Sequence, residues 1–425
     1  SPELERPRQK KTRLDPNPHF KPDKSRQLDA LYGCADLQVP RDHLAREVLR
    51  VVGLLETKAL EEKYSSLGRH GYHPRQVLAV WVYGSLVGLH ESTKLARALQ
   101  TDAALRLLSG GHAISAGTLR RFRNLNRAFF EDAIAQTVHL ASESSLLRPQ
   151  ELGVDSMRLR AHASTSNSRT LRRSRERLAE LRAVSVDGLS EAEGKAHARK
   201  LAKHAEAVAR CEAEGRTNFV TTNGSAGLLK FPDGSAAPGH RITVVAAGKR
   251  ERLILAVLVD ADPNDYGKAG PILQKAKLLF ERLGLLGDER LQAALDAGYW
   301  SEIDLLFAAK NRDWIDMIVA ERGDDDPNVF GRDKFTLLPD GKMTCPSGSL
   351  MRGPISDGKG RGRRYYGVGC ADCSLKPQCT RGKARSLTVL PSFDEVRNLM
   401  RERLALPDAT QRYNDRIATV EPVFS

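Results

Sequence analysis

The order of apolar segments in the middle of the chain constrains the fold more than any other feature. Apolar runs typical of strands fall at 152–159, 241–246, 253–259, 291–295 and 314–319. Between them, apolar residues at helical spacing fill 271–283 and 302–310. The order strand, hairpin, helix, strand, helix, strand predicts an α/β core with one mixed sheet.

Three acidic residues stand at the ends of apolar segments. Asp155 ends the apolar run 152–154 at the start of the first expected strand, Asp296 ends the run 291–295, and Glu421 follows the helical stretch 417–420. Catalytic groups of α/β proteins gather at the carboxyl ends of strands, so we expect these carboxylates to converge. Such a set suits Mg²⁺ or Mn²⁺, and paired ions of this kind act in displacement at phosphodiesters. Taken singly, each acid is more often a turn residue or helix cap.

The charge balance narrows the class of partner. The 425 residues carry 67 Lys and Arg against 53 Asp and Glu, a net charge of +14. This excess favours binding to nucleic acid, although a chain that is merely basic is the alternative. No apolar run reaches the roughly 18 residues of a membrane span, and the start has no apolar signal core. We therefore expect a bacterial cytoplasmic protein that associates with the nucleoid and not with a membrane.

The N-terminal third reads as all-α. Residues 1–35 are expected to form a basic flexible segment, and 36–148 a helical domain. Within it, a glycine turn at 109–111 precedes a capped helix that carries Arg120, Arg121 and Arg123. Helix, turn and basic helix together predict a helix-turn-helix-like contact with DNA. A helical bundle with a solvated basic face fits the pattern equally well.

The segment 165–215 is rich in Arg, Ala and Glu and predicts a basic helical hairpin broken near Gly188. Arg172 and Arg173 at its start are candidates for phosphate contacts, with a solvated charged hairpin as the alternative. The hairpin lies within the expected catalytic core, which comprises 149–320 and 405–425.

A small cysteine-rich insertion is expected at 321–404. It carries a CxxC pair, Cys370 and Cys373, together with Cys345 and Cys379. Four thiolates satisfy a tetrahedral structural Zn²⁺, which would help replace the core that this segment lacks. An iron–sulfur cluster and unligated thiols are the alternatives.

These segments together resemble the DDE transposases of bacterial insertion sequences, whose catalytic core is RNase H-like. More narrowly, the chain is similar to the group with a helical N-terminal domain and a cysteine-rich insertion before the last glutamate. The motifs that carry the resemblance are His73-Pro-Arg-Gln-Val-Leu78, Ser115-Ala-Gly-Thr-Leu-Arg-Arg-Phe122, Val154-Asp155-Ser156, Asp296-Ala-Gly-Tyr299, Cys370-Ala-Asp-Cys-Ser-Leu-Lys-Pro-Gln-Cys379 and Thr419-Val-Glu-Pro-Val-Phe424. Each is weak alone, and their order along the chain makes the match specific.

The resemblance implies an enzyme that cleaves DNA and transfers strands at the ends of an insertion sequence. Asp155, Asp296 and Glu421 would ligate two Mg²⁺ or Mn²⁺ ions, and the first and fourth strands of the core would be neighbours. The expected partners are the terminal inverted repeats and the target DNA, with a homodimer on the paired ends. Arg158, Arg160 and Arg416 are further candidates for DNA contact.

The sequence departs from the family pattern at its end. It stops at Ser425, four residues after Glu421, where family members continue into a basic helix. A truncated, catalytically inactive DNA-binding remnant is therefore one alternative, and a related metal-dependent nuclease is another. Pro422 cannot donate a backbone hydrogen bond, so Glu421 is expected at a helix start or kink.

Overall fold

The computed structural model describes residues 19–424, except for 32, 66, 149–150, 186–187, 323–328 and 357–361. Residues 1–18 of the expected flexible segment therefore lie outside the described part. The chain divides into two compact units, 1–141 and 142–425, and each is described by itself. None of the described helices combines the length and the apolar character that crossing a membrane requires.

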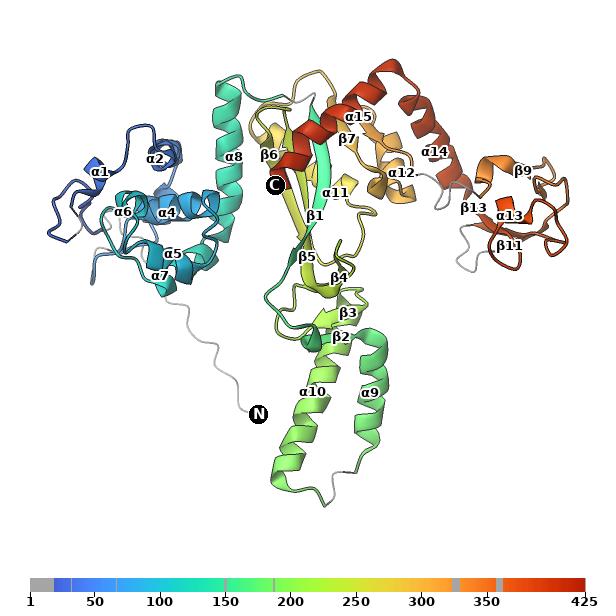
Figure 1. Cartoon of the computed structure of the whole chain (residues 1–425), viewed down its shortest axis with the longest axis horizontal. Helices are drawn as coiled ribbons and strands as arrows, with labels where there is room; N and C mark the ends of the chain where they lie inside the picture. The colour runs from blue at the N-terminus through green and yellow to red at the C-terminus, as the bar shows by residue number, and fades with distance from the viewer. Residues whose placement is uncertain are drawn as a thin grey trace, which may run out of the picture. The chain divides into compact units, whose positions relative to one another are not determined.

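The first unit is helical, as expected for the N-terminal region (Figure 1). Its helices are α1 (Ala35–Gln38), α2 (Leu44–Leu54), α3 (Lys58–Glu61), α4 (Pro74–Leu86), α5 (Ser92–Ala98), α6 (Ala103–Leu108), α7 (Ala116–Leu125) and α8 (Arg127–Glu143), the last of which runs just past the unit's boundary. Helix α4 supplies much of the core, because residues 77–81 are almost fully buried. The described residues before α1 are tied to this unit, since Lys21 N donates to Gly71 O and Lys24 N to Gly110 O.

The predicted helix, glycine turn and helix are present as α6, a turn and α7. Gly110 and Gly111 have φ values of +66° and +74°, which is the left-handed region that favours glycine. The Ser115 hydroxyl accepts from the Thr118 backbone N–H at 3.2 Å and caps α7. The turn residues and the cap thus explain where each helix ends and begins.

The second unit is built on a six-stranded mixed sheet. Its strands are β1 (Leu152–Arg160), β4 (Gly227–Lys230), β5 (Ala236–Ala247), β6 (Leu253–Asp260), β7 (Leu291–Leu295) and β8 (Ile315–Val319). The main order is β6-β5-β1-β7-β8, with β4 also paired to β5. Strands β6, β5 and β1 are antiparallel, whereas β1, β7 and β8 are parallel. The first and fourth strands of the predicted core are therefore neighbours, as in an RNase H-like arrangement.

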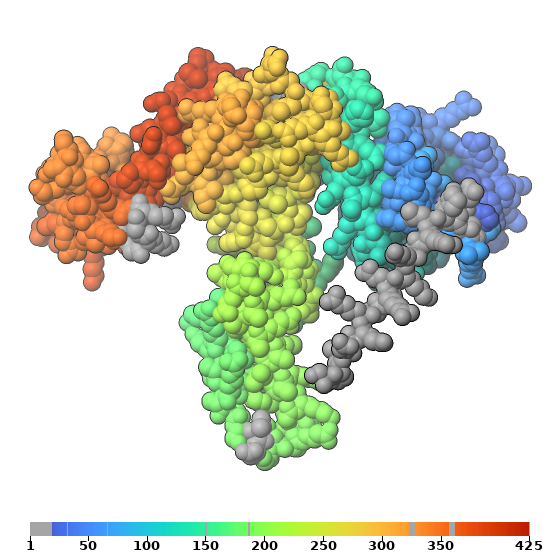
Figure 2. All heavy atoms as spheres, turned by 180° about the vertical axis from the view of Figure 1, so that it is seen from behind, coloured from blue at the N-terminus to red at the C-terminus, as the bar shows by residue number. Residues whose placement is uncertain are grey.

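Two helices continue this core, and a helical hairpin extends from it. Helices α11 (Ala269–Arg282) and α12 (Glu302–Lys310) connect β6, β7 and β8, while α9 (Leu171–Ala183) and α10 (Glu191–Ala213) form the predicted hairpin. The short strands β2 (Ser168–Thr170) and β3 (Asn218–Val220) pair at its base. Figure 2 shows the hairpin as a narrow arm of this unit.

The cysteine-rich segment folds around a small core of its own, which includes Met343, Met351 and the fully buried Tyr365. Its elements are β9 (Thr336–Leu337), β10 (Met343–Thr344), β11 (Arg352–Ser356), β12 (Arg363–Tyr366), α13 (Lys376–Cys379) and β13 (Ser386–Val389). Helices α14 (Pro391–Leu404) and α15 (Pro407–Val420) then return the chain to the sheet, and a 3₁₀ turn covers Glu421–Phe424.

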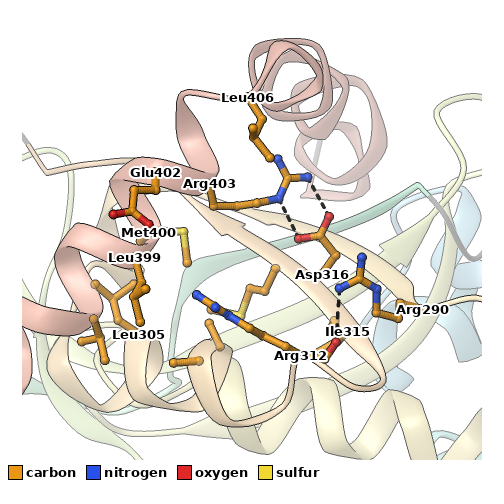
Figure 3. A pocket seen from close by; sticks show the side chains of 14 residues that line it. Arg290, Leu305, Arg312, Ile315, Asp316, Leu399, Met400, Glu402, Arg403 and Leu406 are labelled. Carbon is orange, nitrogen blue, oxygen red and sulfur yellow. Dashed lines mark hydrogen bonds and ion pairs between the residues drawn. The ribbon is translucent and has the colours of Figure 1, made fainter.

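Asp316 of β8 forms ion pairs with both helices that return the chain to the sheet. It bonds to Arg403 of α14 at 2.6 Å and to Arg412 of α15 at 2.5 Å, and its side chain is only 18% exposed. A hollow of about 470 Å³ lies between α12, β8 and α14, and both apolar residues such as Leu305 and Met400 and charged residues such as Glu402 line it (Figure 3). It contains none of the residues singled out from the sequence, so we assign it to packing.

Candidate active site

Pairing of β1 with β7 brings the first two acids together. Val154 is the register partner of Leu295, and Asp155 and Asp296 are the next residues along these parallel strands. Neighbouring strands lie about 4.8 Å apart, so the two backbones are adjacent at this edge despite their distance in sequence. The Asp296 side chain also caps the following 3₁₀ turn by accepting from Gly298 N–H at 3.0 Å. The predicted neighbourhood of the two aspartates is thus present.

Helix α15 delivers the third acid by packing on β1. A methyl group at Gly153 would lie 3.0 Å from Val420 Cβ, so the absent side chain allows this close approach. The helix ends at Val420, and Glu421 begins the 3₁₀ turn that contains Pro422. The sequence predicts Glu421 at a helix start or kink. In the structure it lies where the α-helix ends and the 3₁₀ turn begins.

Pro422 explains why the α-helix stops there. Proline has no N–H for the carbonyl four residues earlier, which belongs to Ala418. Instead, Arg252 Nε donates to Ala418 O at 3.1 Å. Lys249, in the same turn between β5 and β6, pairs with Asp415 at 3.1 Å. The β5–β6 hairpin thus holds the end of α15.

Arg416 links the acids of the site. Its guanidinium donates to Asp155 Oδ2 at 3.1 Å and to Glu421 Oε1 at 3.0 Å. The Arg416 side chain is 6% exposed, against 19% for Asp155 and 47% for Glu421. The Arg416 Nε atom is buried and has no partner in the described part of the chain. Arg416, considered from the sequence as a DNA contact, is therefore a buried counter-ion of two of the three acids.

The surroundings of Asp155 and Asp296 destabilise the ionised forms of both side chains. Burial raises the pKa of Asp155, and the Glu421 charge acts in the same direction, while Ser156 N–H and Arg416 oppose the rise. Burial also raises the pKa of Asp296, and the Asp155 charge adds to this effect. Partly desolvated carboxylates that repel one another favour an added cation between them.

A fourth carboxylate, Asp265, belongs to the same cluster. Its Oδ1 accepts from the Ser156 hydroxyl and from Arg241, whose side chain is only 2% exposed. A methyl group at Gly298 would lie 3.0 Å from Asp296 Oδ1 and 3.1 Å from Asp265 Oδ2. The two carboxylates therefore flank the same glycine.

No sequence pattern distinguishes Asp265 from its neighbours Asp260 and Asp262. Both of those acids pair with Lys268, whereas Asp265 faces Arg241 and the site. The missing signal was the buried Arg241 in the middle of a strand, because a buried guanidinium requires an acidic partner.

Tyr299 is buried beside the carboxylates. Its side chain is fully buried, and its hydroxyl has no hydrogen-bond partner of good geometry among the described residues. Burial raises its pKa well above the ordinary range, and the charges of Asp265, Asp155 and Asp296 add to the rise. The hydroxyl therefore remains protonated and available as a donor.

The arginines predicted to contact DNA differ in their surroundings. Arg158 donates to Lys230 O at 2.5 Å, and Arg160 donates to Asp233 and lies over the Phe231 ring. Arg172 of the hairpin pairs with Glu176 at 3.4 Å, and Arg173 is exposed. On α7, the side chains of Arg120, Arg121 and Arg123 are all exposed.

Four cysteines meet in the cysteine-rich segment. Cys345, Cys370, Cys373 and Cys379 line one hollow of about 310 Å³. Burial raises the pKa of Cys379, and the other three thiols act in the same direction. Burial also acts to raise the pKa of Cys345, but hydrogen bonds with Ser347 and Ser349 lower it overall, which favours a thiolate. All four are free, as are Cys34 and Cys211.

The donor atoms of the carboxylates and of the thiols suit the expected metals. In neither set, however, do the donor atoms surround a common position. Among the described residues, no three His, Cys, Asp or Glu side chains are grouped so that they could ligate one ion as they stand. At the acids, Arg416 bonds to two of the three residues that an ion would use. Carboxylate oxygens nevertheless suit Mg²⁺ or Mn²⁺, and thiolates suit Zn²⁺.

The raised pKa of Asp296 predicts how a neutral substitution changes stability. Ionising a carboxyl whose pKa is higher in the folded protein than its unfolded value of about 3.9 costs folding free energy. The contribution of Asp296 to the unfolding free energy of the wild-type protein therefore falls as the pH rises from about 4 through the pKa that Asp296 has in the folded protein. Asp296→Asn keeps the acceptor for Gly298 and should raise the unfolding free energy at neutral pH by roughly 1 kcal/mol, as measured by urea denaturation. The gain should vanish below about pH 3.

Asp316→Asn is the matched control with the opposite sign. Burial raises the pKa of Asp316, but hydrogen bonds and charges of Arg403 and Arg412 outweigh it and lower the value. This substitution should therefore destabilise the protein at neutral pH, with a loss that shrinks as pH falls below about 4. Equal effects of both substitutions at neutral pH would contradict the electrostatic account.

Two family models match the chain in the order that the structure suggests. A transposase domain (DUF772) matches residues 34–125, within the helical unit, and a transposase DDE domain matches 344–425, from Cys345 through Glu421. Asp155 and Asp296 lie outside both matches. Neither a curated protein nor a solved structure matches the chain significantly. Together with the mixed sheet, the two ordered matches support a DDE transposase of insertion sequences.

Proposed function

We propose that the chain catalyses metal-dependent DNA strand cleavage and strand transfer at the ends of an insertion sequence. The observation that carries this proposal is the gathering of Asp155, Asp296 and Glu421 at one edge of the sheet. Two come from adjacent parallel strands, and the third comes from a helix that packs on the first strand. A metabolic enzyme that uses the same acids fits less well, because the chain is strongly basic.

Each acid has a distinct part in this scheme. Asp155 and Asp296 would hold the cation pair from the sheet, and Glu421 would close the site from α15. Bound Mg²⁺ or Mn²⁺ supplies activation of a water or a 3′-hydroxyl and stabilisation of the leaving 3′ oxygen. The Arg416 guanidinium, which now bonds to Asp155 and Glu421, would be placed to donate to a DNA phosphate once these carboxylates are engaged elsewhere. The Tyr299 hydroxyl and Asp265 would order the waters around the acids.

DNA contact away from the acids is assigned to basic side chains. Arg120, Arg121 and Arg123 of the helical unit and Arg172 and Arg173 of the hairpin are exposed. From each of these two groups, at least one arginine would bind phosphates of the terminal repeats or the target. Arg158 and Arg160 follow Asp155 along β1, so they could bind the strand close to the reacting phosphate. A homodimer would hold two ends together.

The test uses linear DNA with candidate terminal repeats, the full chain, and Mg²⁺ or Mn²⁺. Cleavage at the repeat ends, followed by joining to a second DNA, is the expected result. Asp155→Asn should reduce the cleavage rate by at least about 10³-fold, because one oxygen ligand of the cations is replaced by an amide. Denaturing gel electrophoresis of end-labelled DNA measures both steps.

Asp262→Asn is the matched control, because it removes the same charge from an acid whose side chain pairs with Lys268 and not with Arg416. It should leave cleavage nearly unchanged. Hydrolysis without joining would favour the related nuclease. Binding with no cleavage under any divalent ion would favour an inactive DNA-binding remnant and would contradict the proposal.

We also propose a structural Zn²⁺ held by Cys345, Cys370, Cys373 and Cys379. The common hollow of the four thiols and the small apolar core of the segment support it. The purified chain should contain about one zinc per molecule by elemental analysis. Cys373→Ser should lower that content and the thermal stability, whereas Cys211→Ser should keep the zinc. Zinc-free protein with four reactive thiols in this segment would refute the assignment.

A further inference from the structure

The helical unit contains a hollow of about 770 Å³. It lies between the loop that follows α3, the start of α4 and one side of α7. Its cationic lining consists of Lys21, Lys63, Arg69 and Arg121, and the imidazole of His70 lies beside them. The volume is within the range of roughly 300–1,000 Å³ that ligand sites occupy. The hollow therefore has the size of a binding site, and none of the acids of the proposed active site lines it.

Its charge is of one sign. Among the described lining residues there is no Asp or Glu, and none of Lys21, Lys63, Arg69 and Arg121 forms an ion pair within the described part of the chain. Lys63 donates instead to the neutral Asn126 Oδ1 at 2.7 Å, and Lys21 lies over the Tyr72 ring. Four unneutralised cations around one concavity create a strongly positive potential.

Some other cations of the same unit form ion pairs, unlike the four that line the hollow. Arg46 pairs with Asp36 at 2.9 Å, Arg50 with Glu47 at 2.8 Å, and Lys94 with Glu91 at 2.8 Å. The four cations of the hollow differ from these three in that they share one concavity and have no acidic partner among the described residues.

The uncharged residues that line the hollow restrict the class of ligand further. Val77 and Phe122 provide apolar surface, Leu125 is 71% exposed, and Asn126 and Thr118 carry polar groups. Burial raises the pKa of Tyr64, so its hydroxyl is a neutral donor. A cationic hollow with apolar and neutral polar walls fits a chain of phosphates joined by sugars better than it fits isolated inorganic anions.

We propose that this hollow binds the sugar-phosphate backbone of duplex DNA through Arg121, Arg69 and Lys63. The proposal rests on the proposed function, and it selects one side of α7 as the DNA-binding side. Arg121 lines the hollow, whereas Arg120 and Arg123 do not. Arg123 lies over the Trp81 ring at 4.7 Å and donates to His90 O at 3.4 Å. The predicted basic helix thus contacts DNA through Arg121 and not through all three arginines.

The test compares two neighbouring substitutions with the same change in charge. Binding of the full chain to fluorescent duplex DNA is measured by anisotropy over a series of salt concentrations. Each lost phosphate contact lowers the slope of log K against log[salt] by about 0.9. Arg121→Ala should show this decrease, and Arg69→Ala with Arg121→Ala should lose about twice as much. Arg120→Ala should keep the wild-type slope.

Circular dichroism and thermal unfolding establish that each variant is folded. Equal slopes for Arg121→Ala and Arg120→Ala, or no DNA binding by the wild-type chain, would overturn the hollow as a DNA site. If the wild-type chain binds with the predicted slopes but cleaves no DNA, the proposed catalytic function fails and the hollow remains supported. If the wild-type chain cleaves DNA but Arg121→Ala keeps the wild-type slope, the hollow is refuted as a DNA site and the proposed catalytic function stands.

Discussion

The buried Arg416 guanidinium, bonded to Asp155 and Glu421, is the interaction on which the candidate site depends. It ties α15 to β1 although 421 − 155 = 266 residues separate the two acids. Removing one partner of such a buried pair typically costs about 3–5 kcal/mol, because the other charge is left without compensation. Asp316, bonded to α14 and α15, and Arg252, bonded to Ala418 O, hold the same helix from two other directions. The cysteine-rich segment can thus intervene between β8 and α14 without displacing Glu421.

The same electrostatics explains why the site suits cations. Burial raises the pKa of both Asp155 and Asp296. Arg416 bonds to Asp155 and Glu421 and also opposes the rise at Asp296, while Arg241 pairs with Asp265. Functional sites commonly retain groups that are unfavourable for stability when the activity needs them. A divalent ion would relieve the repulsion that Arg416 leaves. Under the proposed function, the acids would serve a ligand of high positive charge at a cost to the stability of the unliganded fold.

Local sequence patterns predicted the architecture well, because strand and helix periods depend on near neighbours. The order of β1, β5, β6, α11, β7, α12 and β8, the helical hairpin, and the meeting of Asp155 with Asp296 all follow from such patterns. The short strands β2, β3 and β4 were missed, since so few residues carry too little periodicity. The roles of Arg416 and Asp265 were also missed, because their partners are set by tertiary packing of distant segments. For α7, the sequence indicated a basic helix but could not indicate which arginine faces the hollow.

Hydroxyl-radical cleavage by bound Fe²⁺ tests the central claim most directly, which is that three distant acids form one metal centre. Fe²⁺ substitutes for Mg²⁺ and, with ascorbate and peroxide, cuts the backbone next to its site. The account predicts cuts near 155, 296 and 421 in the same folded chain, all suppressed by excess Mn²⁺ and all lost together in Asp155→Asn. Cuts near only one or two of these positions, or cuts that persist independently of one another, would contradict it.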